Sequence, residues 1–338
     1  MKLVSYKHKE KESLGIIVNG SLYDLHGCDP LIPQTMFQFL NNSGPVMMPL
    51  AGKVQKAITA SGMEAYRVDQ FNLMAPVPRP SSCRDAYAFR QHVASARRNR
   101  GLGMLPEFDQ YPVFYFTNHH SVTGPGPVEC MPDHFEQLDF ELEVAVVIGK
   151  AGKNIRAEEA DDYIAGYMIM NDLSARTLQM EEMLLSLGPA KGKDFATATG
   201  PWLVTPDELE PYLIAPQEGH TGRSYALDMV CRVNGHEVSR GNTRDMNWTF
   251  AEIIERCAYG TEIFPGDIIG SGTVGTGCFL ELNGTAKLKD PAYQPVWLKE
   301  GDVVEMEITG LGILQNTITR SGSDFSILKR KKAPCEVS

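Results

Sequence analysis

The chain has 338 residues, of which 43% are hydrophobic and 22% are charged, a composition typical of a globular protein with a large core and about two domains. Acidic residues outnumber basic ones by 42 to 32, which argues against nucleic acid as a principal partner because phosphate binding needs a basic face. No apolar run reaches the roughly 18 residues of a membrane span, and the start MKLVSYKHKEKESLG lacks the apolar core of a signal peptide. No membrane partner is therefore expected.

The cysteines are odd in number, scattered, and never arranged as CxxC. This pattern indicates neither a disulfide framework nor a zinc site. We expect reduced, mostly buried thiols in a cytoplasmic protein. The seven positions are Cys28, Cys83, Cys130, Cys231, Cys257, Cys278 and Cys335.

The first 75 residues predict a small β-rich domain. Short strands are indicated at 2–8, 14–20 and 21–25, with Asn19-Gly20 as a two-residue hairpin turn. Helical patterns follow at 35–44 and 50–62. Three prolines follow within residues 76–80. Because proline has no backbone N–H to donate to a neighbouring strand, we place a domain boundary there and divide the chain into domains 1–75 and 76–338.

The larger part is rich in strand patterns and has few strand–helix alternations, which favours a β-rich α+β fold. Neither GxGxxG opening a helix nor GxxxxGK[ST] is present, so nucleotide-binding α/β folds lose support. The methionines and leucines of 180–188 recur at helical spacing and are interpreted as core. Strands are predicted at 112–118, 138–149, 167–172, 201–205, 225–235, 267–275, 278–284 and 302–318, and helices at 157–167, 174–188 and 248–260.

An acidic strand is the most informative segment. In a strand at 138–144, Asp139, Glu141 and Glu143 would share one face, and the apolar run that follows indicates a central strand covered on both sides. Buried, unpaired carboxylates are costly, so either Lys and Arg side chains or a metal ion would have to face them. The alternative is a solvated edge strand with its acids turned outward.

Two further segments bring polar groups toward such a site. Asp172 ends an apolar strand just before a predicted helix, where an aspartate can point into a site or serve as an ordinary N-cap. Upstream, residues 84–92 (RDAYAFRQH) combine acid, phenol, cation and imidazole.

Taken in order along the chain, these motifs resemble the fumarylacetoacetate hydrolase family, and most closely its fumarylacetoacetase branch. The resemblance rests on the spacing of Asp85 and His92, the ExE of Glu141 and Glu143, MNDLSAR at 170–176, GKDFATATGPW at 192–202 and PGDIIGSGT at 265–273. It covers about residues 80–320 and implies a mixed β-sandwich or roll with peripheral helices, a homodimer and a divalent metal site.

Carried over residue by residue, the resemblance implies four metal ligands: Asp85, Glu141, Glu143 and Asp172. Oxygen ligands without Cys or His suit a hard cation, Mg²⁺ or Ca²⁺, with Mn²⁺ as a third candidate. An octahedral ion with four protein oxygens would leave two positions for a substrate.

The resemblance also implies the catalytic groups. His92 matches the family's general base, and Glu281 matches the acid that orients it. Lys193 matches a lysine that faces the substrate, and Arg176 and Gln179 match groups that contact the substrate or its developing charge. The alternatives are a structural histidine, a charged strand residue at 281, and surface roles for the arginine and glutamine.

Substrate contacts are implied at Tyr87, Tyr115 and Thr273, although each could equally be a core polar group. Arg100 lies in a basic, glycine-spaced segment after His92 that could be a lid capturing a substrate carboxylate or a solvated loop. Met183 stands where fumarylacetoacetases carry a tyrosine.

The resemblance implies a hydrolase of aromatic catabolism that cleaves a carbon–carbon bond in a small 1,3-diketo acid with His/Glu-activated water. A 2-oxo-acid decarboxylase, isomerase or hydratase on the same fold and metal site is the alternative. A non-catalytic metal-binding domain used for assembly is the third interpretation.

Overall fold

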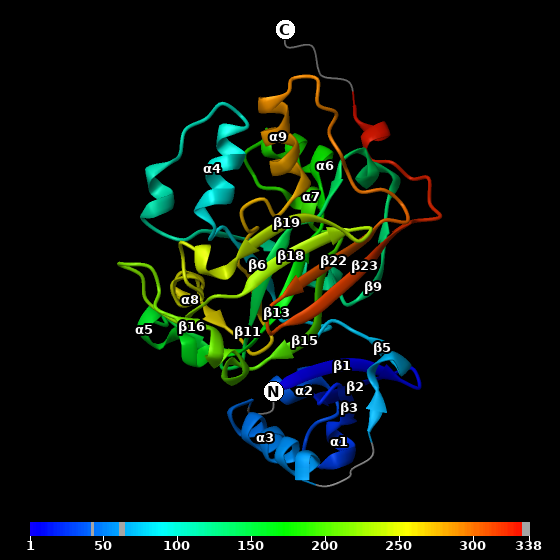
Figure 1. The fold of residues 1–338 in the computed structure, drawn as a ribbon, viewed down its shortest axis with the longest axis vertical. Coiled ribbons are helices and arrows are strands. Elements are labelled where there is room, and N and C mark those ends of the chain that lie inside the picture. Colours follow the sequence, from blue (N-terminus) through cyan, green and yellow to red (C-terminus); the bar gives the residue numbers. More distant parts are fainter. Residues whose placement is uncertain (42–43, 61–64, 333–338) are drawn as a thin grey trace.

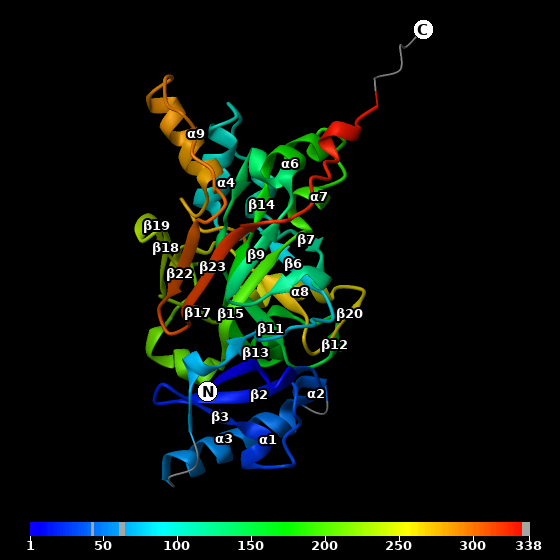
Figure 2. The same ribbon diagram turned by 90° about the vertical axis from the view of Figure 1, so that its right-hand side faces the viewer.

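The computed structural model describes residues 1–41, 44–60 and 65–332. Strands form the body of the molecule, most helices lie at its two ends, and α5 and α8 lie along its side, as Figures 1 and 2 show, so the predicted β-rich α+β class is confirmed. The described helices are α1 (Leu25–Cys28), α2 (Met36–Asn41), α3 (Gly44–Ala60), α4 (Arg90–Arg98), α5 (Ala157–Ala160), α6 (Arg176–Met183), α7 (Ala190–Lys193), α8 (Phe250–Ala258) and α9 (Phe279–Lys289).

The larger sheet runs through both halves of the chain. Its path is β4 (Tyr66–Arg67), β3 (Ser21–Asp24), β2 (Lys11–Val18), β1 (Lys2–His8), β15 (Thr197–Val204), β13 (Ile164–Asp172), β11 (Leu142–Ile148), β21 (Ile268–Gly270), β6 (Cys83–Ala86) and β7 (Phe114–Thr117). Two short strands attach beside this path, β5 (Asn72–Leu73) on β1 and β8 (Val122–Thr123) on β15.

A second sheet packs on the larger one. Its order is β19 (His236–Asn242), β18 (Asp228–Val233), β22 (Val303–Ile308), β23 (Gly312–Arg320) and β9 (Gly126–Cys130). Three two-stranded pairs complete the described strands: β10 (Leu138–Asp139) with β14 (Ser174–Ala175), β12 (Gly152–Lys153) with β20 (Glu262–Ile263), and β16 (Leu213–Ile214) with β17 (Ser224–Tyr225).

The predicted hairpin at Asn19-Gly20 is confirmed. It joins β2 and β3, and its residues have φ values of 50° and 78°, as expected for a turn whose twist matches the strands.

Strand β11 is covered on both faces, as its apolar run predicts. Val144 and Val146 belong to the core between the two sheets, whereas Ala145 and Val147 belong to a second core that also contains Leu3 and Phe39. Alternating side chains of one strand therefore hold both layers together.

Residues before and after the predicted boundary at 75 are joined by hydrogen bonds. Lys2 and Leu3 of β1 pair with Val204 and Leu203 of β15, so the first strands extend the larger sheet. The division into domains 1–75 and 76–338 stays a prediction. In both views the N-terminal strands and α1 to α3 lie at one end of the molecule, and α4, α6, α7 and α9 lie at the other.

Several of the predicted elements are wrong. The single strand predicted at 302–318 is two antiparallel strands, β22 and β23. Residues 278–284 do not form a strand, because α9 begins at Phe279. The predicted strand 138–149 is interrupted between β10 and β11. The predicted helix 157–167 stops early, since α5 ends at Ala160 and β13 begins at Ile164.

The interpretation of 180–188 as core is also wrong. Leu184, Leu185 and Leu187 are 84%, 82% and 95% exposed, and Met183 is 43% exposed, because α6 ends at Met183 and the chain then loops outward.

Some predictions concern residues outside the described ranges: the helix ends at 42–43 and 61–62, and Cys335. Cys28, Cys83, Cys130, Cys231, Cys257 and Cys278 are free thiols, all buried except the half-buried Cys28. Over the described ranges, no helix combines the length and the apolar character needed to cross a bilayer.

Candidate active site

Four buried carboxylates meet in the large sheet, on β13, on and just before β11, and on β6, with β21 lying between β11 and β6. Asp85 lies in β6, Glu143 in β11 and Asp172 at the end of β13, while Glu141 immediately precedes β11. One oxygen from each lies within 4.8 Å of the others. The structure thus brings together all four residues that the resemblance assigns to a metal.

Two glycines of the GSGT segment make room for this cluster. A Cβ atom at Gly270 would lie 2.6 Å from Asp85 Oδ1 and 2.9 Å from Glu143 Oε2. The backbone N–H of Gly272 donates to the same two oxygens, at 3.0 Å and 3.1 Å. Gly272 has φ of 78°, and a Cβ there would lie 2.6 Å from the carbonyl oxygen of Ala86. The motif therefore supplies both the space and a fixed donor.

The carboxylates perturb one another strongly. Burial, and then the charge of Asp172, raises the pKa of Asp85 to about 7. Burial, and then Asp85, raises the pKa of Glu143 well above its usual range. Burial would also raise the pKa of Glu141, but the charges of Lys193 and Arg176 outweigh it and hold that pKa at about 2. Without a further cation, the Asp85 side of the cluster resists full ionisation.

The donor set fits a hard divalent cation. All four groups are carboxylates, which suit Mg²⁺, Ca²⁺ or Mn²⁺. Asp172 Oδ1 is a buried oxygen without a hydrogen-bond donor among the described residues, although its partner Oδ2 accepts from Tyr115 and Lys193. A buried carboxylate oxygen left unpaired is costly, and a cation would satisfy it.

We expect the stabilisation by a divalent cation to grow with pH. The folded-state pKa values of Asp85 and Glu143 are raised, and Asp85, faced by Asp172, Glu141 and Lys193, has a value of about 7. The metal-free fold is therefore favoured most below about pH 4 and loses stability as pH rises through 7. A bound cation removes this loss.

The measurement is the thermal unfolding midpoint at pH 5 and pH 8, with chelator and with excess Mg²⁺ or Mn²⁺. We expect the cation to raise the midpoint by about 5 °C or more at pH 8 and by much less at pH 5. An equal rise at both pH values would contradict the arrangement.

Two buried cations border one side of the cluster. Lys193 Nζ lies 2.5 Å from Glu141 Oε2 and 2.8 Å from Asp172 Oδ2. Arg176 Nη2 lies 2.8 Å from Glu141 Oε1, and its Nη1 donates to Gln179 Oε1 at 2.9 Å. Burial alone would lower the pKa of Lys193, but the adjacent Asp172 and Glu141 raise it instead. Both cations therefore remain charged at neutral pH.

Asp139 does not join the cluster, contrary to the prediction that it shares a face with Glu141 and Glu143. The strand breaks after Asp139, whose carboxylate turns to Arg176, with Nε donating at 2.8 Å. Because β10 ends at Asp139 and β11 begins at Leu142, the alternation of one continuous strand does not apply, and Asp139 forms an ion pair with Arg176 instead.

His92 and Glu281 form a buried pair between α4 and α9. His92 Nδ1 lies 2.7 Å from Glu281 Oε2, which also accepts from the backbone N–H of Thr276 at 2.9 Å. Because an ionised carboxylate only accepts, we assign the proton to Nδ1, which leaves the Nε2 lone pair available. His92 lies near enough to Glu141 that its protonated form would lower the pKa of that acid, so the pair lies next to the cluster at Glu141.

The predicted substrate contacts take different places. Tyr115 donates to Asp172 Oδ2 at 2.5 Å, and Thr273 Oγ1 lies 3.5 Å from Glu143 Oε1. Both residues therefore support the carboxylates. The Tyr87 ring is 5.9 Å from that of His92 and is half-buried beside the pair. Arg100 is exposed, donates to Ala96 O at 3.2 Å, and lies near enough to Tyr87 to lower its pKa against the larger, raising effect of burial.

A family model, fumarylacetoacetate hydrolase C-terminal, matches residues 82–319, the part of the chain that holds all of these groups. The chain belongs to the fumarylacetoacetate hydrolase family. It is a family enzyme with a metal-binding acidic cluster.

The names of proteins similar to this chain indicate different activities. "Oxaloacetate tautomerase Fahd2a, mitochondrial" of Rattus norvegicus is 30% identical over 328 residues, 94% of this chain and 91% of its own. A probable 2-hydroxyhepta-2,4-diene-1,7-dioate isomerase of Mycobacterium abscessus superposes with a TM-score of 0.67 at 25% identity, covering 96% and 100% of the two chains. The structure of maleylpyruvate hydrolase of Sphingobium sp. SYK-6, in complex with manganese(II) and pyruvate, superposes with a TM-score of 0.67 at 22% sequence identity. The match covers 95% of this chain and 99% of that one.

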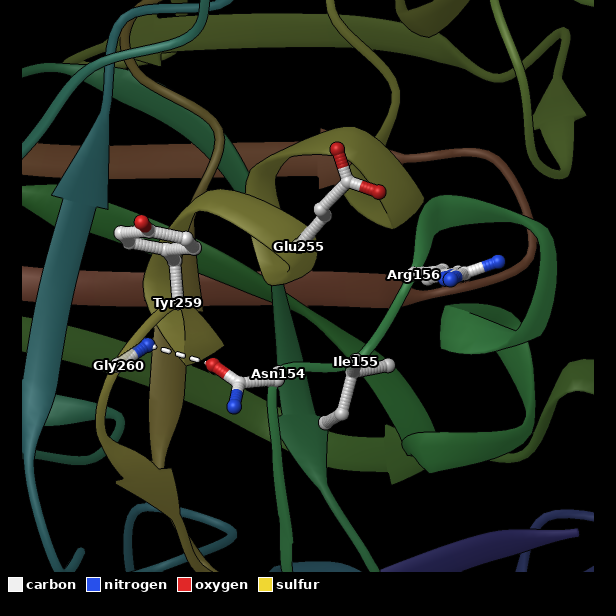
Figure 3. A pocket seen from close by; sticks show the side chains of 6 residues that line it. All are labelled: Asn154, Ile155, Arg156, Glu255, Tyr259 and Gly260. Atoms are coloured by element: carbon white, nitrogen blue, oxygen red, sulfur yellow. Dashed lines mark hydrogen bonds between the residues drawn. The ribbon is translucent and has the colours of Figure 1, made fainter.

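A shallow hollow on the surface of this protein lies apart from these groups. Figure 3 shows its lining, where Asn154 Oδ1 accepts from the backbone N–H of Gly260 at 2.8 Å. None of the lining residues belongs to the carboxylate cluster or to the His92–Glu281 pair, so the hollow is not the candidate site. The lining residues are Asn154, Ile155, Arg156, Glu255, Tyr259 and Gly260.

Sequence reasoning missed two supporting positions. The GSGT glycines entered only as part of a motif, and the role of the Gly272 N–H depends on its positive φ and on its approach to Ala86. Asn99, whose Nδ2 donates to Glu281 O at 3.1 Å, links α4 to α9, and no sequence signal marks that contact.

Replacement of Gly272 by alanine should weaken the metal site. The new Cβ would collide with the Ala86 carbonyl in a strained backbone conformation, and the N–H would move away from Asp85 and Glu143. We expect a destabilisation of about 2 kcal/mol or more and a lower metal affinity, measured by urea unfolding and by calorimetric titration with Mn²⁺. Gly235→Ala is the control, since its φ is 78° and no atom lies within 4 Å. Equal metal affinities in the two variants would contradict the prediction.

Proposed function

We propose that the enzyme hydrolyses a carbon–carbon bond in a small 1,3-diketo acid. The observation that carries the proposal is the buried His92–Glu281 pair, which lies near Glu141 of the carboxylate cluster and leaves His92 Nε2 to act as a base. A base oriented by a carboxylate is the arrangement that removes a proton from water at neutral pH.

Asp85, Glu141, Glu143 and Asp172 would hold the cation. A divalent cation supplies Lewis acidity and a template for two substrate oxygens when bound. We propose Mg²⁺ or Ca²⁺, with Mn²⁺ as a third candidate, because the donor set contains oxygen alone. The manganese and pyruvate of the Sphingobium hydrolase support an oxo acid at such a centre.

His92 performs the proton transfer. Its Nε2 accepts a proton from water, whose oxygen adds to the carbonyl carbon. Glu281 holds the Nδ1 proton and stabilises the imidazolium that forms. The Thr276 N–H fixes the same carboxylate oxygen, so the base keeps one orientation.

Lys193 and Arg176 supply positive charge next to Glu141. Both are buried and fully charged beside Glu141, so either can stabilise the oxyanion that develops on the attacked carbonyl. Gln179, held by Arg176, presents its amide nitrogen as a further donor. Cleavage then transfers the bonding electrons to the oxo-acid fragment as an enolate, and the His92 imidazolium returns its proton to the enolate carbon.

Oxaloacetate tautomerisation is the second candidate. It is favoured by the full-length similarity to the rat protein of that name, 94% of this chain and 91% of that relative. The same histidine could move a proton between carbon and oxygen without adding water.

The deciding experiment is proton NMR of the purified protein with fumarylacetoacetate, fumarylpyruvate, acetylpyruvate and oxaloacetate, each with Mg²⁺ and with chelator. Metal-dependent appearance of two acids from a diketo substrate would support hydrolysis and rank the acyl groups. Accelerated enol–keto exchange of oxaloacetate without cleavage would establish the tautomerase instead, and release of carbon dioxide would establish a decarboxylase.

We also propose that the enzyme is a cytoplasmic homodimer and that the exposed leucines after α6 are buried in it. Leu184, Leu185 and Leu187 form an apolar loop between α6 and α7, and such exposed groups commonly mark an interface. Their position next to the helices that carry Arg176 and Lys193 would let a second copy cover that side of the site.

Leu187→Asp should shift the protein from dimer to monomer in light scattering coupled to gel filtration. A buried charge in the interface costs several kcal/mol. Leu288→Asp, at an exposed position of α9, is the control. A dimer that persists in Leu187→Asp would place the interface elsewhere.

A further inference from the structure

Asp139 is a buried carboxylate without a place among the catalytic groups or the metal ligands. It is completely buried, and ionised aspartate has about four acceptor sites. Its Oδ1 accepts from the N–H groups of Phe140 and Phe279 at 2.9 Å and 2.7 Å. Its Oδ2 accepts from the Leu280 N–H at 2.9 Å and from Arg176 Nε at 2.8 Å. Every site is therefore in use.

The contacts to Phe279 and Leu280 cap α9 from outside the helix. The N-cap residue of α9, Cys278, makes no side-chain cap hydrogen bond, so the first turn depends on a carboxylate from another strand. A negative charge at a helix N-terminus also interacts favourably with the helix dipole. Glu281 lies one residue beyond these two N–H groups and directs its carboxylate to His92.

The remaining partner of Asp139 is Arg176, which also contacts the carboxylate cluster. Arg176 Nη2 lies 2.8 Å from both Asp139 Oδ2 and Glu141 Oε1. One guanidinium thus joins Asp139 to a carboxylate of the cluster, a geometry that the planar fork of arginine suits.

We propose that Asp139 is a positioning residue that sets the orientation of the general base relative to the carboxylate cluster. It ties the first turn of α9, which carries Glu281, to the guanidinium that holds Glu141. This inference rests on the proposed role of His92 as the base. Because α4 and α9 lie at the end of the molecule away from the N-terminal strands (Figure 1), a fixed anchor to the sheet matters for their alignment.

The test replaces Asp139 by asparagine, which keeps the shape but turns an amide toward Leu280 and Arg176. The control is Asp133→Asn. Asp133 is also buried and accepts from two N–H groups of another segment, those of Ile327 and Leu328.

The first readout is the tautomer of His92, observed by ¹⁵N NMR of labelled imidazoles and assigned by its loss in His92→Ala. We expect the Nδ1–H form in the wild type and in Asp133→Asn, and a mixture of tautomers in Asp139→Asn. The second readout is catalysis. We expect kcat of Asp139→Asn to fall about 100-fold with KM changed less than threefold.

An unchanged tautomer in folded Asp139→Asn would overturn the proposal. The NMR result needs no turnover, so it stands even if none of the diketo acids is cleaved, and a failure of the proposed reaction is thereby distinguished from a failure of the positioning role.

A second pair of variants decides the matter if Asp139→Asn does not fold. Phe279→Pro removes the N–H that donates to Asp139 at a position where proline is tolerated, the first residue of a helix. Phe279→Ala removes the same ring but keeps that N–H. The proposal requires mixed His92 tautomers in the proline variant alone, and the same tautomer in both variants would refute it.

Discussion

Replacement of His92 by alanine is expected to lower kcat by about two to four orders of magnitude, the usual contribution of a general base, while divalent-cation affinity changes little. His92 contacts Glu281 and borders the carboxylates but is not one of them. The measurements are steady-state kinetics on the substrate identified by NMR and calorimetric titration with Mn²⁺.

His220→Ala is the matched control for this variant. His220 also pairs with a glutamate, at 3.0 Å from Glu252 Oε2, near the start of α8, and it has no contact with the carboxylate cluster. We expect its kcat to stay within about twofold of the wild type. Full turnover in His92→Ala with metal bound would remove His92 from the mechanism.

Replacement of Glu143 by glutamine is expected to lower cation affinity at least about 100-fold and to abolish activity with it, because a charged ligand is lost from an all-carboxylate site. The same change should stabilise the metal-free protein at pH 8. Glu143 is fully buried, and burial and the adjacent Asp85 raise its pKa well above the usual range, so a neutral side chain relieves repulsion.

The two effects have opposite signs, which separates them from a general loss of structure. Thermal unfolding with chelator should give a higher midpoint for Glu143→Gln than for the wild type, and addition of Mn²⁺ should reverse the order. A lower midpoint in chelator would show that the wild-type cluster carries no repulsion at that pH. Glu129→Gln, at an exposed position of β9, should leave both quantities unchanged.

The sequence predicts the strands better than the connections between them. Apolar runs such as that of β13 mark buried strands directly, and Asn19-Gly20 marks its turn by local chemistry. Residues 278–284 mislead because F-L-E-L alternates like a strand, whereas the helix there depends on Asp139, 140 residues earlier in the chain. A tertiary cap of this kind leaves no local pattern.

The site shows the same division. Motif order along the chain indicates which residues belong together, but it contains no distances. Asp139 pairs with Arg176 instead of joining the other acids because the strand breaks there. Tyr115 and Thr273 contact carboxylates because of the way β7 and the GSGT loop pack. Neither could be read from residue spacing.

The pairing of β1 with β15 limits edge-to-edge aggregation of the large sheet. A bare sheet edge offers unpaired N–H and C=O groups to other chains and is a recurrent starting point for aggregation. Here Lys2 and Leu3 occupy part of that edge on β15, while Leu3 and Phe39 shield the adjoining apolar face of the strands that end in the carboxylates. The described part of residues 1–75, which contributes no side chain to the candidate site, thus covers part of the sheet that presents it.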